Sequence, residues 1–291
     1  MQILFDELEA RLLSPKLWKG FAPPVAGAFP YSASGNPVIG LFDDFLGFGQ
    51  TCPLSTSTTY FQSNGISYIG YNDTTVDPTD AAVPTTTPAV DENGPGVIVV
   101  QADTTDNDLA CIQAGGITAG GSTMCPFHVI PTRMQELVFE CRIKVSSIAA
   151  SSTNLFIGLA GAGACANSGV FVDDDASMAS NNFLGFQRIG SMSSTLDFKY
   201  QRVGGTESQK DDVVTLVADT YVNLGFRYHA ARKQCSVWVD GAEVTAARVS
   251  STITGATPWP SLYMNFLAAT QYQATSSHAL YIDWWACAQL L

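Results

Sequence analysis

The sequence predicts an all-β protein, an antiparallel sandwich of two packed sheets that follows a short N-terminal helix and an extended arm. Three observations predict it. Several segments alternate apolar and polar residues with the period of two that half-buried strands show. The pair Asp240-Gly241 separates two such segments and is typical of a β-hairpin. Beyond the N-terminus, no segment has the apolar spacing of a long helix.

The first residues have the spacing of an amphipathic helix over residues 2–13, which Ser14-Pro15 would end. Acidic residues fall early in this segment, where the helix dipole favours them. A stripe this short has no surface nearby in the sequence to bury it, which favours contact with another molecule over packing on the chain's own edge. The stripe consists of Ile3, Leu4, Leu8 and Leu12.

Residues 20–40 are rich in Pro, Gly and Ala, which indicates an extended arm. Residues 74–95 are dense in Thr, Pro and Asp and predict a long surface loop. We therefore expect two parts, residues 1–40 as the helix and arm and residues 41–291 as one β-sandwich domain. The length allows one large all-β domain.

The body of the chain contains the alternating segments. In residues 136–145, the odd positions from Leu137 to Val145 are apolar, and the even positions are polar except Val138. Residues 196–201 and 222–229 alternate in the same way. The residues expected in the core include Leu137, Phe139, Ile143, Phe198, Leu224, Phe226, Val237, Val239, Ile282 and Trp284.

The last strand, near residues 279–287, departs from this pattern. Leu280, Ile282, Trp284 and Ala286 would face the core, yet the opposite face carries Tyr281, Trp285 and Cys287 and is also apolar. A strand that is apolar on both faces needs a cover, which the arm or a neighbouring subunit could supply. The residues expected to bind a partner are Ile3, Leu4, Leu8, Leu12, Leu17, Trp18, Phe21, Tyr281 and Trp285.

Composition narrows the function. The net charge of −12 and the pI of about 4.4 argue against nucleic-acid binding, because an acidic protein repels phosphates. The sequence contains no run of 18 apolar residues, so it predicts no membrane-spanning helix. The N-terminus lacks the features of a secretory signal, so we expect synthesis in a cytoplasm. The cysteines number seven, an odd count, and predict buried, reduced thiols without disulfides.

Motifs with catalytic or metal-binding chemistry are weak. Glycosidases of jelly-roll fold place two Glu and an Asp on alternate positions of one strand, but Val138 stands between Glu136 and Glu140. Solvated polar positions are the favoured interpretation of both glutamates. The acidic runs at 173–175 and 103–108 could bind calcium, but neither matches an EF-hand loop, and Asx turns explain such runs as well. The cysteines and His128 lack the spacing of a zinc site. We expect no enzyme, cofactor or metal.

The order of several weak motifs carries a resemblance. Phe42-Asp43-Asp44-Phe45 opens the body, the hairpin at Asp240-Gly241 follows late, and Tyr281-Ile282-Asp283-Trp284 closes it. This order resembles concanavalin-like jelly rolls and, among them, structural proteins of tailed-bacteriophage virions, including head-decoration and tail-associated proteins. The resemblance implies a jelly-roll fold for residues 41–291 and supplies no catalytic residues.

Two classes of function follow. The first is a non-enzymatic capsid decoration or cement protein in a virion, which binds the major capsid protein or another virion protein through its N-terminal arm and forms a homo-oligomer, with a trimer as one option. The second is a carbohydrate-binding, lectin-like module on a phage head or tail, with Trp238, Trp259 and Tyr263 as candidate surface-glycan contacts. A degenerate glycosidase is a weaker third class.

Overall fold

The computed structural model describes residues 13–21, 27–31, 37–45, 52–53, 58–72, 96–102, 107–115, 117–118, 121–122, 125–149, 153–165, 170–172, 177–189, 194–249, 253, 258–272 and 278–291. The expected helix with Ile3, Leu4, Leu8 and Leu12, the expected loop at 74–95 and the acidic run at 173–175 lie outside these residues. Within the described part, the only helices are the 3-10 turns η1 (Ala230–Arg232) and η2 (Thr245–Ala247).

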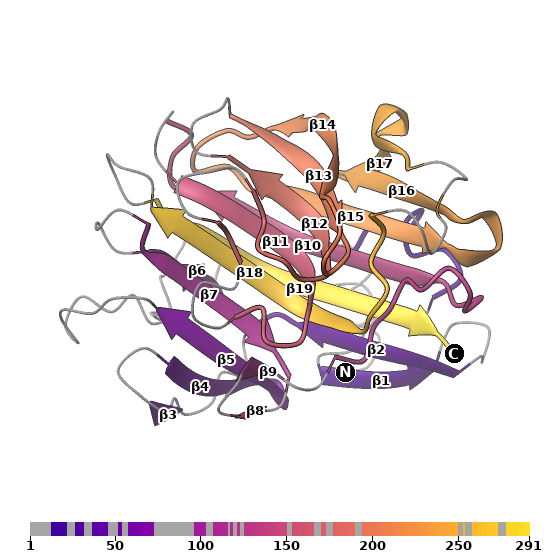
Figure 1. Ribbon diagram of the computed structural model, residues 1–291, viewed down its shortest axis with the longest axis horizontal. Coiled ribbons are helices and arrows are strands. Elements are labelled where there is room, and N and C mark those ends of the chain that lie inside the picture. Colours follow the sequence, from indigo (N-terminus) through magenta and orange to yellow (C-terminus); the bar gives the residue numbers. More distant parts are fainter. Residues whose placement is uncertain are drawn as a thin grey trace, which may run out of the picture.

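The strands form two large antiparallel sheets, as the sequence predicts. Figure 1 shows them stacked, with β14 and β17 at the upper edge of the view and β3 and β4 at the lower edge. Sheet A has the order β1 (Gly27–Tyr31), β2 (Pro37–Asp43), β19 (Leu280–Leu290), β10 (Leu137–Val145), β15 (Val222–His229), β16 (Gln234–Val239), β17 (Ala242–Glu243), and β6 (Ile98–Val100) also pairs with β19. Sheet B has the order β14 (Ser208–Thr215), β13 (Thr195–Gln201), β12 (Phe183–Arg188), β11 (Thr153–Gly161), β18 (Met264–Tyr272), β7 (Leu109–Ala114), β5 (Ile66–Asn72), β4 (Thr58–Ser63), β3 (Cys52–Pro53), while β8 (Ile117–Thr118) and β9 (Gly121–Ser122) form a small hairpin.

The main core lies between the two sheets and follows the predicted alternation. The odd positions of β10 point into it, and Phe139 stacks on Phe226 of the neighbouring strand at 4.9 Å between ring centroids. Of the residues expected in the core, all are buried except Val239, which is partly buried and packs against the core. Trp284 is buried, but on the other face of sheet A.

The last strand, β19, is central in sheet A rather than at its edge, and a β-bulge reverses its faces. Its pairing with β10 shifts by one residue at Asp283, between the pairs of Ile282 and Trp284. A bulge inserts one extra residue, so every later side chain changes face. Ile282 and Trp285 therefore both point into the core, while Trp284 points outward. The expected faces of Trp284 and Trp285 were wrong.

The N-terminal boundary also differs from the expectation. β1 and residues 37–40 of β2 belong to sheet A, where β2 pairs with β19. The sandwich thus begins within the residues expected to form the arm, and the division at residue 41 falls inside β2. Pro and Gly content indicated an arm because it disfavours strands, but strand pairing overrides local propensity here.

The Phe42-Asp43-Asp44-Phe45 motif is structural. The Asp43 carboxylate is fully buried and accepts hydrogen bonds from Ser63 Oγ at 2.7 Å, the Phe45 backbone N–H at 2.8 Å and Tyr68 Oη at 2.7 Å. Trp285 Nε1 donates to the Tyr68 hydroxyl at 2.9 Å, which joins the two sheets. Burial raises the pKa of Asp43, and these hydrogen bonds oppose that rise. The motif therefore ties β2 to sheet B.

The hairpin between β16 and β17 confirms the prediction from Asp240-Gly241. Both residues have positive φ, 47° and 74°, which a two-residue hairpin turn of this kind requires.

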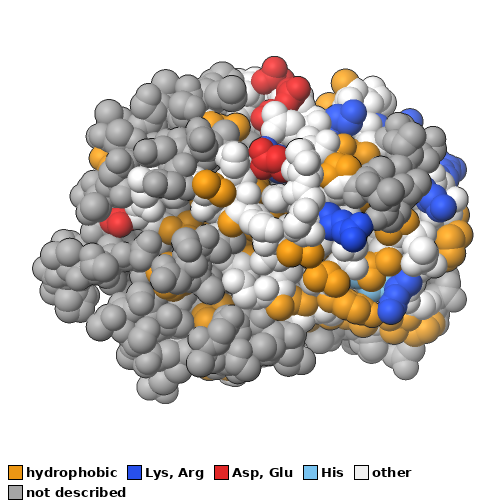
Figure 2. Space-filling model, in the orientation of Figure 1, with side chains coloured by type: hydrophobic (Ala, Val, Ile, Leu, Met, Phe, Trp, Pro, Cys, Tyr) orange, Lys and Arg blue, Asp and Glu red, His pale blue; other side chains and the backbone are white. Residues whose placement is uncertain are grey.

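Figure 2 shows one face of the molecule, on which Asp and Glu side chains gather at the upper edge and Lys and Arg lie at the right among apolar side chains. Among the side chains that Figure 2 draws in colour, most acidic and basic groups thus lie in different parts of this face.

Candidate binding surface on the outer face of sheet A

The outer face of sheet A carries the polar side chains of β10, and residues 13–21 lie across the middle of it. Glu140 of β10 is 1% exposed and anchors this segment. Its carboxylate accepts hydrogen bonds from the Ser14 backbone N–H at 3.0 Å, from Ser14 Oγ and from Trp18 Nε1 at 2.7 Å. Burial raises the pKa of Glu140, and these three donors oppose the rise. Its expected solvated position was wrong.

Apolar packing completes the docking of this segment. Leu17, Trp18 and Phe21 are at most 5% exposed, and they pack with Val138 and Trp284 on the outer face of the sheet. This contact explains why Val138 breaks the polar alternation of β10 and why β19 is apolar on both faces. Residues 13–21 therefore provide the cover that the second apolar face of β19 needs.

Three side chains expected to bind a partner, Leu17, Trp18 and Phe21, are thus used within the chain. Trp285, expected in the same role, is 0% exposed and stacks on Phe266 at 4.8 Å. These four side chains offer no accessible surface to another protein, because sheet A and the main core already bury them. Tyr281 is partly exposed and is described below.

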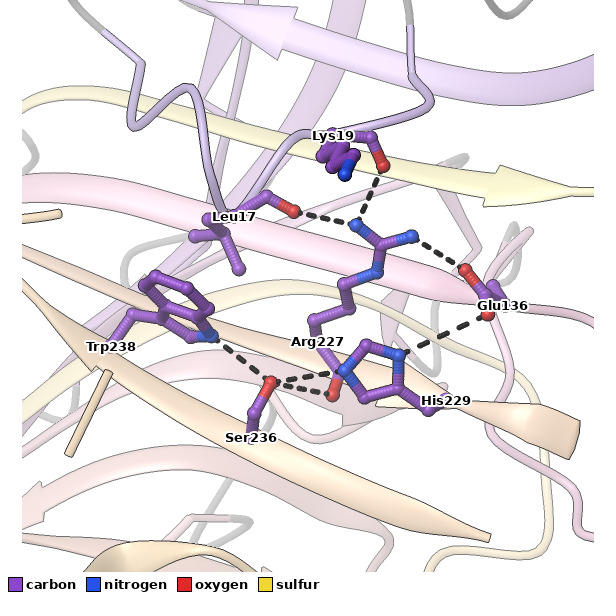
Figure 3. A network of polar contacts seen from close by, with 7 residues as sticks. All are labelled: Leu17, Lys19, Glu136, Arg227, His229, Ser236 and Trp238. Carbon is purple, nitrogen blue, oxygen red and sulfur yellow. Dashed lines mark hydrogen bonds and ion pairs between the residues drawn. The ribbon is translucent and has the colours of Figure 1, made fainter. Parts of the chain in front are cut away.

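The far end of the docked segment is held by Arg227 of β15 (Figure 3). One guanidinium nitrogen donates to the carbonyl oxygens of Leu17 at 3.0 Å and Lys19 at 2.7 Å, and another donates to Glu136 Oε2 at 2.7 Å. His229 lies on the other side of Glu136, with Nδ1 3.9 Å from Oε1. The contacts with His229 and then with Arg227 lower the pKa of Glu136 to about 2, against a partial rise from burial.

Glu140 of β10 and Glu136, which directly precedes β10, therefore have structural roles. Glu140 is sealed under residues 13–21, and Glu136 is held by Arg227 and His229. A glycosidase needs two carboxyl groups that flank one open cleft. Glu136 and Glu140 do not form such a pair, since the docked segment covers one of them.

Beyond the docked segment, three strands place aromatic and basic side chains in one row. Lys144 of β10 pairs with Tyr281 of β19, and Tyr221 directly precedes β15, beside the Ile143–Val222 pair. The Lys144 ammonium lies 4.9 Å from the ring centroid of each tyrosine. A cation between two aromatic faces is held by the quadrupoles of both rings. All three side chains are partly exposed.

The adjoining row adds hydrogen-bonding groups. Arg142 lies over the Tyr221 ring at 4.1 Å and forms an ion pair with Asp283, and these two side chains are 27% and 20% exposed. The bulge at Asp283 brings that carboxylate to Arg142. Asn223 occupies the outward position of β15 that pairs with Arg142. We call Tyr221, Tyr281, Arg142, Lys144, Asn223 and Asp283 the tyrosine–cation patch.

The glycan contacts suggested by the sequence fall elsewhere. Trp259 is 1% exposed and donates from Nε1 to the Val129 carbonyl at 2.8 Å, so it braces a loop in the core. Trp238 packs against the docked segment and donates to Ser236 Oγ at 3.0 Å. Tyr263 is 41% exposed and lies under Arg133 at 5.4 Å. The structure does not bring these three together at one site.

No motif in the sequence indicates that the patch is a site. Its residues come from three strands that are distant in the chain, and only Tyr281 was among the expected binding residues. Within the described ranges, no three His, Cys, Asp or Glu side chains are grouped as metal ligands would be. None of the helices described is long and apolar enough to span a membrane.

Comparison with solved structures finds distant similarities. The peanut lectin structure aligns over 76% of this chain and 97% of its own length, with 10% identity and a TM-score of 0.45. The Emp47p carbohydrate recognition domain aligns over 76% and 87%, with 10% identity and a TM-score of 0.43. The endo-β-1,4-glucuronan lyase of the fungus Trichoderma reesei aligns over 85% and 94%, with 10% identity and a TM-score of 0.42.

The strand pairing itself shows an all-β antiparallel sandwich of two sheets, as the sequence predicted. No protein-family model and no curated protein sequence matches the chain. An all-β sandwich hosts many unrelated functions, so the function of this protein must be argued from its sites.

Proposed function

We propose that this protein is a carbohydrate-binding, lectin-like module, and that an acidic saccharide binds at the tyrosine–cation patch. The observation that carries the proposal is the row Tyr221–Lys144–Tyr281, in which all three side chains are partly exposed and the cation lies near both rings. Lys144 and Tyr281 lie on the paired strands β10 and β19, and Tyr221 directly precedes β15. Rigid strands hold the row in place, so little conformational entropy is lost when a ligand binds.

The chemistry of the patch suits a sugar that carries a carboxylate or sulfate. Among the residues of the patch, Arg142 and Lys144 carry two positive charges and Asp283 carries one negative charge. The patch thus has a net positive charge, whereas the whole protein has a net charge of −12. Guanidinium and ammonium groups donate to anionic oxygens, and the Arg fork matches a carboxylate. Asn223 and Asp283 add the acceptor and donor groups that pairs of sugar hydroxyls need. The aromatic rings provide the apolar walls usual in ligand sites.

The test is binding to a glycan array that contains neutral, uronate-bearing, sialylated and sulfated oligosaccharides. We expect binding to the acidic members, and a loss of at least about tenfold in affinity for Arg142→Gln and for Lys144→Gln, because each removes a charge-assisted contact. Arg232→Gln is the matched control, since it removes one charge from an exposed turn. Absence of glycan binding, or equal affinity in both patch variants and the control, would refute the proposal.

We further propose that the protein is not an enzyme. The support is that both candidate carboxylates are already engaged: Glu140 is buried under Trp18, and Glu136 is bound by Arg227. The test is incubation with polysaccharides that include polyuronates, followed by detection of reducing ends and of unsaturated sugars. Release of either product, abolished by a substitution in this chain, would contradict the proposal.

The virion role is a second proposal. Glu140 and Arg227 fasten residues 13–21 to the sandwich, so residues 1–12, with Leu8 and Leu12, connect to the body at a fixed point. A fixed attachment point suits an anchor that carries the module on a particle. We propose that residues 1–12 bind the major capsid protein or another virion protein and that the protein forms a homo-oligomer. Deleting residues 1–12 should abolish occupancy on particles and leave the sandwich folded; undiminished occupancy would contradict it.

A further inference from the structure

Two cysteines far apart in the sequence meet on the outer face of sheet B. Cys111 lies on β7, and Cys165 follows the turn after β11. Their sulfur atoms are 2.7 Å apart, and both residues are 1% exposed. A disulfide bond has a length of about 2.05 Å, so the two sulfurs are unbonded but need only a small movement to bond.

The contact is built into the fold. Gln113, which lies two positions after Cys111 on β7, accepts from the Cys165 backbone N–H at 3.1 Å and donates to the Gly161 carbonyl at 2.7 Å. These bonds hold the turn of residues 161–165 across β18 and onto β7. Cys165 Sγ also lies 3.7 Å from the Ile69 carbonyl oxygen of β5. Both thiols belong to the apolar cluster that covers this face of the sheet.

We propose that Cys111 and Cys165 are a cross-linking site that forms an intramolecular disulfide when the protein meets a low-molecular-weight disulfide. One thiolate attacks the small disulfide and releases one small thiol, and the second thiolate then attacks the mixed disulfide and releases another. The protein loses two electrons and two protons, and the small disulfide is reduced to two thiols. The reaction requires a transient opening of the 161–165 turn, because both sulfurs are buried.

The cross-link would fasten a covering segment to the sheet. Cys165 begins the part of the chain that leads to Val170, Phe171 and Met178, which pack in the same outer cluster as Cys111. A bond across this separation constrains the unfolded chain, so it should raise the midpoint of thermal unfolding by roughly 5 to 10 °C. The expectation of reduced thiols without disulfides would then hold only in a reducing environment.

The test is treatment of the folded protein with oxidised glutathione, alkylation of remaining thiols in denaturant, and intact-mass and peptide analysis. We expect two fewer alkylated thiols than in the untreated protein and a reducible peptide pair that contains Cys111 and Cys165. Cys111→Ser and Cys165→Ser should each abolish the pair, whereas Cys125→Ser, at a partly exposed thiol, should retain it.

The peptide pair in the unmutated protein decides the question even if a serine variant fails to fold. Full alkylation after oxidation, a stable glutathione adduct in place of the internal bond, or a pair that joins other cysteines would each overturn the proposal.

Discussion

The substitution Leu17→Ala tests whether residues 13–21 are an integral part of the fold. Leu17 is 0% exposed and packs directly on the backbone of Gly225. A Cβ added to Gly225 would lie only 2.4 Å from Leu17 Cδ2. Burying a leucine side chain stabilises by about 1.5–3 kcal/mol, and the cavity left by its removal adds to the cost. The floor of this cavity is the backbone of β15, which has no side chain at Gly225 to move into it. We therefore expect a loss of about 3 kcal/mol.

The loss should appear first as local undocking, because the segment is fastened by only a few side chains. Hydrogen exchange of the Trp18 and Phe21 amides, which bond to the carbonyls of Ser14 and Trp18, reports that opening directly. Urea unfolding reports any loss that reaches the whole domain. Lys16→Ala, at an exposed position of the same segment, is the control. If Leu17→Ala changes the exchange of these amides and the unfolding midpoint no more than Lys16→Ala does, the segment is not part of the fold.

Three further predictions concern the same sheet and its neighbour. The pKa of Glu136 is lowered to about 2, so the ionised side chain stabilises the fold fully above its ordinary pKa of 4.5, and this stabilisation is lost as the pH falls from 4.5 to about 2. Glu136→Gln should therefore reduce the fall of the urea unfolding midpoint over that pH range. An unchanged slope of midpoint against pH would contradict this. Arg227→Lys should weaken docking by about 1–3 kcal/mol, because a lysine lacks the fork that reaches Glu136 and two carbonyls together; exchange of the Trp18 amide at the native rate would count against it. Gly185→Ala should destabilise the domain by several kcal/mol, at least about 3, since its Cβ would lie 2.3 Å from the Ile157 carbonyl oxygen of β11; a soluble variant with the native thermal midpoint would disprove it.

The sequence by itself determined the fold class and much of the core. The alternation of β10 and β15 is a local property, since successive side chains of any strand point to opposite faces. The pair Asp240-Gly241 specified its hairpin because the turn needs two residues that tolerate positive φ. Apolar residues on both faces of the last strand also showed that something must cover it.

Only the tertiary structure decided which face of that strand is which and what covers it. The bulge at Asp283 is a property of the pairing between β19 and β10, so no periodicity within β19 reveals that Trp285 points inward and Trp284 outward. The docking of residues 13–21 depends on Glu140 and Arg227, and the sequence shows them only as polar positions of two strands.

The candidate sites were also decided only by the tertiary structure. The tyrosine–cation patch gathers Lys144 of β10, Tyr281 of β19 and Tyr221, which directly precedes β15. Cys111 meets Cys165 on the outer face of sheet B. Strand order and register set these distances, and both are determined by the cooperative packing of the whole sandwich rather than by neighbours in the chain.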